Sequence, residues 1–402
     1  MKASEPLRWT KAQSKDQHFY FTSPSATCDG KYVLSISEGN NGVSINVIER
    51  ISGEVICVAN ADTVMRSYVY ANGAINGISK ASPFLDDERN IVYWIQDGAI
   101  FCVCLNDLPT TKRKIYELPH GWWTAYTHVS RDGNYMCVTC TEPAAFDDAD
   151  LTQHDQLKNV PPRMIEKELS TKILVICTES GDLVSSTEIP FWVTHVQFDP
   201  QGTGNILFNC EGTVGSRGLR DFPYWGRMWL LEKQGNWRRV MAQPVGDTVN
   251  HENWNDYGEI IFHGHVALNF FGKARVILSR ILRKLGIISH CQLQNSRDHY
   301  IAKCDQLGEI SWKIRVNFPV SHAVAIPGCN DEVLADSRDG NIYRIRCYSD
   351  GSYSQETLVK HGSSMIDQDC HPHPSMNRFG KSAFFSTDML SACDVFEISL
   401  NR

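Results

Sequence analysis

The chain has 402 residues, of which 42% are hydrophobic and 21% are charged, a composition typical of a soluble globular protein with a substantial core. The formal net charge of −7 argues against general nucleic-acid binding, and no apolar run reaches the ~18 residues of a membrane span. The N-terminal Met1-Lys-Ala-Ser-Glu-Pro lacks the apolar stretch of a secretory signal, so we expect a cytoplasmic protein whose cysteines are free thiols.

Short β-rich runs separated by Gly, Asp and Asn turns fill almost the whole chain. One pattern recurs along it: a polar or His-bearing start, a turn, and then a hydrophobic strand. The copies begin, in chain order, at Thr27, Pro83, His128, His195, His251, His290 and His373. Spacings of about 40 to 75 residues, with about four strands in each repeat, are typical of propeller blades.

The repeat predicts an all-β fold, a single seven-bladed β-propeller domain over residues 1–402. The approximate blades are 22–66, 70–118, 122–189, 192–243, 248–286, 288–362 and 368–402. The last copy has room for three strands, so we expect an N-terminal strand within 5–22 to complete it and close the ring. The long spacings indicate insertions at 143–170 and 305–335. Two separate β-sandwiches are the alternative, which a single repeat along the chain fits less well.

Two local patterns carry weaker signals. Cys137-Val-Thr-Cys140 has the spacing of a zinc or redox pair, but positions i and i+3 of a strand face opposite sides, which argues against both. The basic segment 270–286 could attract an anionic sugar or a lipid surface, whereas solvated charges on a short helix or on outer blade strands are the favoured interpretation. It has no acid, and its cations are Lys273, Arg275, Arg280, Arg283 and Lys284.

The C-terminal stretch Gln368-Asp-Cys-His371-Pro-His373-Pro predicts a metal site. Residues two apart in a strand point to the same face, so His371 and His373 can aim their imidazoles at one point, and Gln368 can add an amide oxygen. These ligands suit a borderline or hard divalent metal; a surface His-Pro turn is the alternative. Because inner strands line a propeller channel, the recurrent histidines could converge at one mouth. They are His128, His195, His251, His290 and His373.

Several segments match a family pattern in the right order. They are Cys210-Glu-Gly212, Gly226-Arg-Met-Trp-Leu230, His251-Glu-Asn-Trp254, Ser289-His290 and Gln368-Asp-Cys-His-Pro-His-Pro-Ser375. On these residues the chain, from about Trp122 onward, resembles the oligogalacturonate lyases, family 22 of the polysaccharide lyases, which are seven-bladed propellers. The resemblance implies a divalent metal, with manganese expected, held by His290, Gln368, His371 and His373. It also implies His251 as the catalytic base with Arg227 beside it.

The implied reaction is β-elimination on a short uronic-acid oligosaccharide, an anionic substrate. A metal offsets the charge of the sugar carboxylate, and a neutral His251 removes the C5 proton, so no nucleotide or redox cofactor is needed. Arg227 could bind a carboxylate or assist at the C4 oxygen, or instead be a buried ion-pair partner. His128 and His195 are candidates for substrate contact, and His263 and His265 are interpreted as structural or rim residues.

The chain also departs from the family pattern. The stretch between Glu211 and Arg227 is longer than in the pattern, and the basic segment 270–286 is unusual. A glucuronate- or rhamnose-linked substrate is therefore an alternative to galacturonate, and a non-catalytic propeller that binds a glycan or peptide is another. The propeller of a serine peptidase is not supported, because the sequence has no Gly-x-Ser-x-Gly motif.

Overall fold

The computed structural model places most of the chain. The residues that it describes are 5–11, 14–39, 42–62, 70–71, 77–109, 111–146, 159–212, 226–244, 247–266, 277–278, 281–282, 284–285, 298–366, 370–390 and 392–400. Strands dominate this part of the chain. Its helical elements are η1 (Leu105–Asp107), η2 (Pro143–Phe146), α1 (Val160–Glu166) and helical residues within 277–285.

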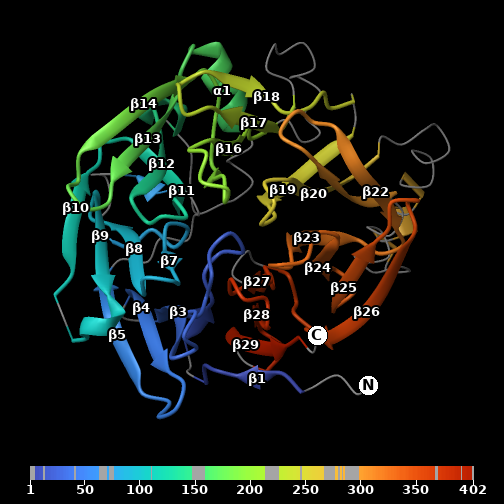
Figure 1. Ribbon diagram of the computed structural model, residues 1–402, viewed down its shortest axis with the longest axis horizontal. Helices are drawn as coiled ribbons and strands as arrows, with labels where there is room; N and C mark the ends of the chain where they lie inside the picture. Colours follow the sequence, from blue (N-terminus) through green and yellow to red (C-terminus); the bar gives the residue numbers. More distant parts are fainter. Residues whose placement is uncertain are drawn as a thin grey trace.

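The described strands form seven antiparallel sheets arranged in a ring, so the fold is the predicted seven-bladed β-propeller (Figure 1). Short polar turns between runs rich in Val, Ile and Phe favour four-stranded meanders of this kind. The first three blades are β2 (Lys15–Gln17), β3 (Tyr32–Gly39), β4 (Gly42–Glu49) and β5 (Val55–Ala61); β7 (Phe84–Asp86), β8 (Ile91–Gln96), β9 (Ala99–Cys104) and β10 (Arg113–Glu117); and β11 (Trp123–Val129), β12 (Tyr135–Thr141), β13 (Thr171–Cys177) and β14 (Leu183–Ile189), with β6 (Tyr70–Ala71) added beside β11.

The remaining four blades continue around the ring. They are β15 (Val196–Phe198), β16 (Ile206–Asn209), β17 (Met228–Leu231) and β18 (Trp237–Arg239); β19 (Thr248–Trp254), β20 (Ile260–His265), β21 (His299–Cys304) and β22 (Ile310–Val316); β23 (Val320–Ala325), β24 (Glu332–Ser337), β25 (Asn341–Cys347) and β26 (Tyr353–Lys360); and β27 (Ser375–Met376), β28 (Ser382–Thr387) and β29 (Asp394–Ser399) with β1 (Leu7–Arg8). In this last sheet, Leu7 lies opposite Glu397 and Arg8 opposite Phe396.

The border between the fifth and sixth blades differs from the predicted one near residue 287. Strands β21 and β22 belong to the fifth blade, because β21 pairs with β20 along its whole length. The predicted insertion at 305–335 is therefore wrong, since β22, β23 and the start of β24 lie there. The long connection is instead 266–298, between the second and third strands of the fifth blade. The other predicted insertion, 143–170, does lie between strands, and it contains α1.

An apolar cluster of buried residues lies between each pair of neighbouring blades. Cys137 contributes to the cluster between the third and fourth blades, and Cys140 to the one between the second and third. The two thiols thus face opposite sides of β12, as the strand spacing predicted. Among the described residues, no helix has the length and apolar character to cross a bilayer.

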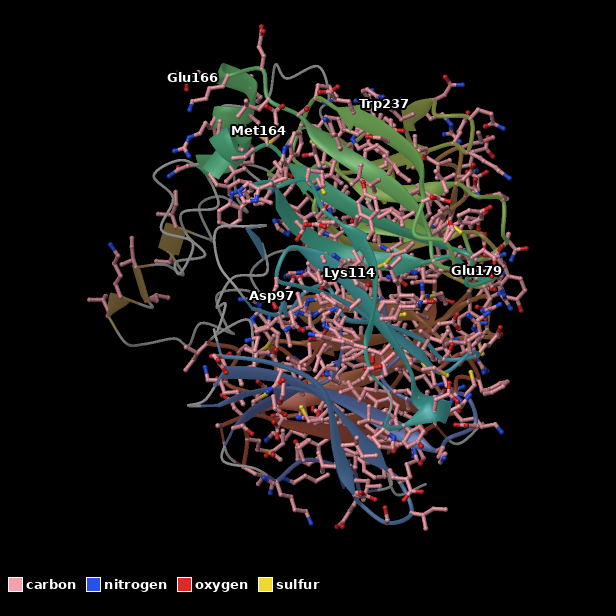
Figure 2. All side chains as sticks on the ribbon, turned by 90° about the vertical axis from the view of Figure 1, so that its left-hand side faces the viewer. Asp97, Lys114, Met164, Glu166, Glu179 and Trp237 are labelled. Carbon is pink, nitrogen blue, oxygen red and sulfur yellow. The ribbon has the colours of Figure 1, made fainter. Side chains whose placement is uncertain are left out.

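The two ends of the propeller differ. Figure 2 shows Asp97 and α1, which carries Met164, toward one end, and Glu179 at the other. Connections between the second and third strand of a blade lie at the first end, and the connections in the third, fourth and fifth blades are long there. This end is called the α1 end below.

Candidate active site and metal centre

Inner strands of five consecutive blades share one register. Each ends in a four-residue turn closed by a backbone hydrogen bond, and these turns begin at Ser130, Asp199, Asn255, Ile326 and Asn377. The residues four positions before these turns are Tyr126, His195, His251, His322 and His373. Their rings contact one another across blade borders: ring centroids are 4.5 Å apart for Tyr126 and His195, and 4.2 Å apart for His251 and His322. The distance from His322 to His373 is also 4.2 Å, so the imidazoles form an arc around the channel.

Local backbone irregularities accompany this register. The pairing of β19 with β20 shifts between Asn250 and Asn253, and the pairing of β23 with β24 shifts between Val320 and His322. A bulge of this kind leaves a residue out of the ladder and re-aims its side chain. His251 and His373 also have positive φ angles, 48° and 43°. Such strain in non-glycine residues is characteristic of functional sites.

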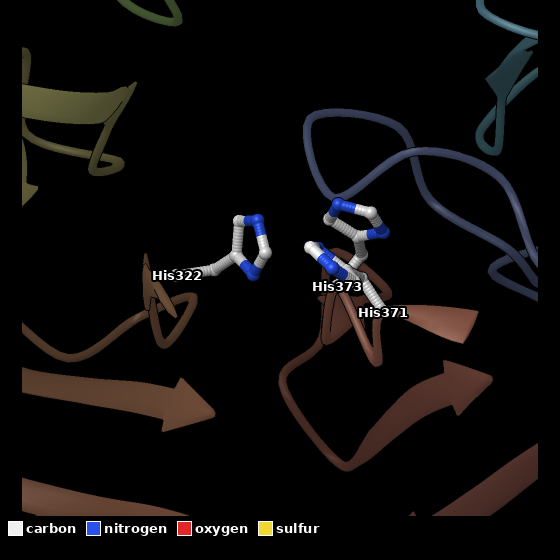
Figure 3. Close-up of side chains that lie close together, drawn as sticks. All are labelled: His322, His371 and His373. Atoms are coloured by element: carbon white, nitrogen blue, oxygen red, sulfur yellow. The ribbon is translucent and has the colours of Figure 1, made fainter. Parts of the chain in front are cut away.

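Three of the histidines form a possible metal site. Ligand nitrogens of His322, His371 and His373 all lie within 4.8 Å of one another, with His322 facing the other two from the neighbouring blade (Figure 3). Burial lowers the pKa of His371 to about 4, with His322 adding to the effect, and burial lowers that of His373 well below its usual value. Both imidazoles are therefore neutral at neutral pH, which is the form that binds a metal.

Buried partners hold these rings from behind. Nδ1 of His322 lies 3.0 Å from Oδ1 of Asp336, and both side chains are almost fully buried. Burial opposes ionisation of Asp336, but its electrostatic interaction and hydrogen bond with His322 outweigh burial and lower the carboxyl pKa. A carboxylate on one ring nitrogen leaves the other free to bind a metal. His18 Nε2 lies 2.7 Å from the backbone oxygen of His373, which fixes that strained residue.

His251 lies beside this cluster and has a histidine partner of its own. Its Nδ1 is 3.0 Å from Nε2 of His263 on the neighbouring strand β20. Burial, followed by the nearby His322, lowers the pKa of both imidazoles well below the usual value. His251 is accordingly neutral and able to accept a proton near pH 7.

Arg227 is buried between two carboxylates. Its Nε donates to Oε2 of Glu252 over 2.6 Å, and its Nη1 is 3.6 Å from Oε2 of Glu211. Burial alone would lower the pKa of Arg227, but the charges of Glu252 and Glu211 raise it. Glu252 directly follows His251 in the chain, and Arg227 is near enough to contribute to the lowered pKa of His251. The guanidinium thus lies beside the proposed base as part of an ion-pair network.

The N-terminal segment after β2 crosses the channel, as the dark blue loop at the centre of Figure 1 shows. The hydroxyl of Tyr20 is 3.0 Å from Nε2 of His195, and its ring lies 5.2 Å from that of His373. The ring of Phe21 lies 5.8 Å from His251 and 5.7 Å from His322. The rings of Tyr20 and Phe21 therefore pack against the histidine arc.

Comparison with protein-family models found no match to this chain, and comparison with curated proteins found none either. Solved structures do match. An oligogalacturonate lyase in complex with manganese has a TM-score of 0.75 at 16% identity, covering 100% of this chain and 96% of that one. The chain has the fold of the oligogalacturonate lyases. A second oligogalacturonate lyase, from Vibrio parahaemolyticus, has a TM-score of 0.73 at 17% identity, covering 100% and 96%. Hydrazine synthase from Kuenenia stuttgartiensis, another match, has a TM-score of 0.56 at 10% identity, covering 100% and 99%.

The structure brings together three of the predicted site residues, His251, His371 and His373, with Arg227 adjacent. His290 and Gln368 lie outside the described residues. His322, which the sequence did not single out, has the position in the sixth blade that His251 has in the fifth. The sequence does contain the pattern of a blade start here, because the turn Ile326-Pro-Gly-Cys329 lies four residues after His322 and the apolar strand β24 follows it.

His128 is not in the shared register, contrary to prediction. It lies two residues before the Ser130 turn, in the position that Gln197 occupies in the next blade, because the intervening segment is shorter. Its ring packs 4.6 Å from that of Phe84 and lines a cavity of about 180 Å³ together with Arg131 and Arg378. His128 therefore lies away from the arc. His195, by contrast, does belong to it.

Proposed function

We propose that this chain is a metal-dependent lyase that cleaves short uronic-acid oligosaccharides by β-elimination. One observation carries the proposal: the neutral imidazole of His251 lies 4.2 Å, ring to ring, from His322 of the three-histidine cluster. A base next to a cation site is what removal of a proton α to a carboxylate requires, because the carboxylate charge must be offset while the proton leaves.

The described donor set fits a divalent metal. His322, His371 and His373 come from two neighbouring blades, and Asp336 supports the first of them. Nitrogen ligands about 2.1 Å from a metal lie roughly 3 to 3.5 Å apart, so small side-chain rotations would close the cluster. In this proposal His322 takes the role that the family resemblance implied for His290, and Gln368 remains the proposed fourth ligand. Imidazole with an amide oxygen suits manganese, the metal in one of the similar lyase structures.

The chain's own residues supply the proton transfer. A bound divalent cation would neutralise the sugar carboxylate and make the C5 proton more acidic. His251 accepts this proton on Nε2, the ring nitrogen that does not contact His263. The C5–H electron pair becomes the C4–C5 double bond, the C4–O bond breaks, and the departing oxygen takes a proton from water. A positioned base of this kind contributes about 10²–10⁴-fold to the rate.

Arg227 and Tyr20 lie where they could recognise the substrate. The guanidinium is next to His251 and could bind a sugar carboxylate or the C4 oxygen, in exchange for its contact of 3.6 Å with Glu211. The half-buried Tyr20 offers a ring and a hydroxyl at the channel. A galacturonate disaccharide or short oligomer is the proposed substrate, and a glucuronate- or rhamnose-linked uronide is the alternative for the same machinery.

An activity assay tests this function. Short oligomers of galacturonate and of glucuronate-containing sugars are incubated with the protein and manganese, and formation of the conjugated C4–C5 double bond is followed by ultraviolet absorbance. We expect an increase on at least one uronide, abolished by a chelator and restored by manganese. Absence of product on every uronide, with metal shown to be bound, would favour a non-catalytic glycan-binding propeller instead.

A further inference from the structure

The basic segment noted in the sequence exposes several large apolar side chains. Residues 277–278, 281–282 and 284 are helical, and the amide of Leu285 donates to the carbonyl of Ile281. Large apolar side chains are exposed there: Ile277 by 58%, Leu278 by 57%, Ile281 by 50% and Leu285 by 67%. None of the buried apolar clusters of the described chain includes them. The favoured expectation of merely solvated charges therefore leaves this surface unexplained.

The exposed side chains follow a helical period. Ile277, Ile281 and Leu285 are four residues apart, and the exposed Leu278 and the half-buried Leu282 repeat this spacing one position later, so the helical period places all five on one side. Lys284 is exposed at the border of this face. In the surrounding sequence, Lys273, Arg275, Arg280 and Arg283 add positive charge, and no acid occurs between 270 and 286.

The segment stands apart from the blades. It lies in the 266–298 connection, which leaves β20 at His265 and returns at His299. Figure 2 shows its short olive-brown ribbons beyond the strands, toward the α1 end. His251 and His263 lie close to the same end of β19 and β20, because Asn250 pairs with His263 and Thr248 with His265.

We propose that this helical segment docks the protein on an anionic lipid surface. Its apolar face requires an apolar partner, and its uniformly positive charge requires a negative one; an anionic bilayer interface supplies both without a matching shape. The charge of the segment also favours a lipid surface over a second copy of this chain. Pairing of the segment with itself in a second copy would bring two all-basic segments together, which repulsion opposes. The net charge of the whole chain is −7, so the bilayer contact depends on this local excess of cations.

Vesicle co-sedimentation of the full chain tests the proposal. The probes are vesicles of phosphatidylglycerol and phosphatidylcholine in equal parts and vesicles of phosphatidylcholine alone, at low and at high salt. We expect binding to the anionic vesicles, at least about tenfold weaker binding to the neutral ones, and release by salt.

A matched pair of variants locates the contact. Leu285→Glu should weaken binding to anionic vesicles at least about tenfold, because it removes an inserted side chain and adds a like-charged group to the interface. Leu307→Glu makes the same change at a residue that is 71% exposed in the β21–β22 turn, at the opposite end of the same blade, and should bind as wild type. Unchanged melting temperatures show that both variants fold.

Three outcomes would overturn the proposal. The first is no binding of the wild type to anionic vesicles at low salt. The second is equal binding by Leu285→Glu and Leu307→Glu. The third is a concentration-dependent oligomer in size-exclusion chromatography that Leu285→Glu dissolves, since this would show that a second copy covers the apolar face.

Discussion

Nδ1 of His251 lies 3.0 Å from Nε2 of His263, and the other ring nitrogen of His263 is buried without a hydrogen-bond partner among the described residues. His251 can accept a proton through Nε2 only when its Nδ1 carries the hydrogen and donates it to His263. His263 would therefore fix both the tautomer and the orientation of the proposed base, as carboxylates and carbonyls do in other enzymes.

Replacement of His263 tests this role. His263→Leu removes the acceptor, and we expect kcat to fall about 10–100-fold with KM little changed. His263→Gln keeps an oxygen acceptor in a side chain of similar length and should retain more of the rate. The measurement is steady-state kinetics on the best uronide. A leucine variant as active as wild type would contradict a positioning role.

The base itself gives a second prediction. His251→Gln should lower kcat about 10²–10⁴-fold while the protein still binds metal, because the three clustered histidines remain. His128→Gln is the control, since His128 lines the separate cavity beside Phe84. Kinetics and metal titration on both variants check the prediction. Comparable losses in the two would mean that the effect of His251 is structural.

Metal affinity should depend on His322 and on the carboxylate behind it. His322→Ala removes a ligand and should abolish tight manganese binding. Asp336→Asn keeps a hydrogen-bond acceptor near Nδ1 but removes the charge, so we expect an affinity about 10–100-fold weaker. Isothermal titration calorimetry on metal-free protein measures both. Wild-type affinity in His322→Ala would place the metal elsewhere.

Buried histidines should make the protein less stable in acid. Burial lowers the pKa of His371 to about 4 and that of His128 to about 3, below the value of ~6.5 in an unfolded chain. Between the folded and unfolded pKa values, the unfolded chain binds more protons than the folded protein. The free energy of unfolding therefore falls as the pH drops below ~6.5. Each such histidine contributes up to about 1.4 kcal/mol per pH unit.

Urea unfolding at about pH 7 and about pH 5 measures this loss. His128→Gln should lose less stability over this interval than wild type, because a glutamine does not titrate there. A loss of the same size in both proteins would show that His128 is not held neutral by the fold.

A double-mutant cycle separates the two roles of Arg227. Arg227→Met leaves the Glu252 carboxylate buried without its ion pair and should cost about 3–5 kcal/mol of stability. Arg227→Met combined with Glu252→Gln should recover much of that loss. If Arg227 contacts substrate, kcat/KM stays low in the double variant although stability returns. Recovery of both would leave Arg227 with a structural role alone.

The fold was predictable because it depends on a repeat. Turn residues and apolar runs recur in each blade, and the seven-fold ring follows from their number. The border near residue 287 was misplaced because the sequence around His290 imitates a blade start, whereas pairing of β21 with β20 is a non-local property. The start of the sixth blade was hidden by its Pro327-Gly328 turn, which lacks the Asp or Asn of the other copies.

The candidate site was predictable only where its members are close in sequence. His371 and His373 lie two residues apart, and their spacing permitted a metal site, with a surface His-Pro turn as the alternative. His322 depends on the register of another blade, and a miscount of two residues placed His128 in the wrong position. Support from Asp336 and His263 comes from neighbouring strands, so no local motif contains it.

A crystal structure of the protein soaked with manganese tests the central claim most directly. We expect one ion bound by His322, His371 and His373, with at least one coordination position open toward His251. An ion enclosed entirely by protein ligands, or no ion between these three side chains, would contradict it.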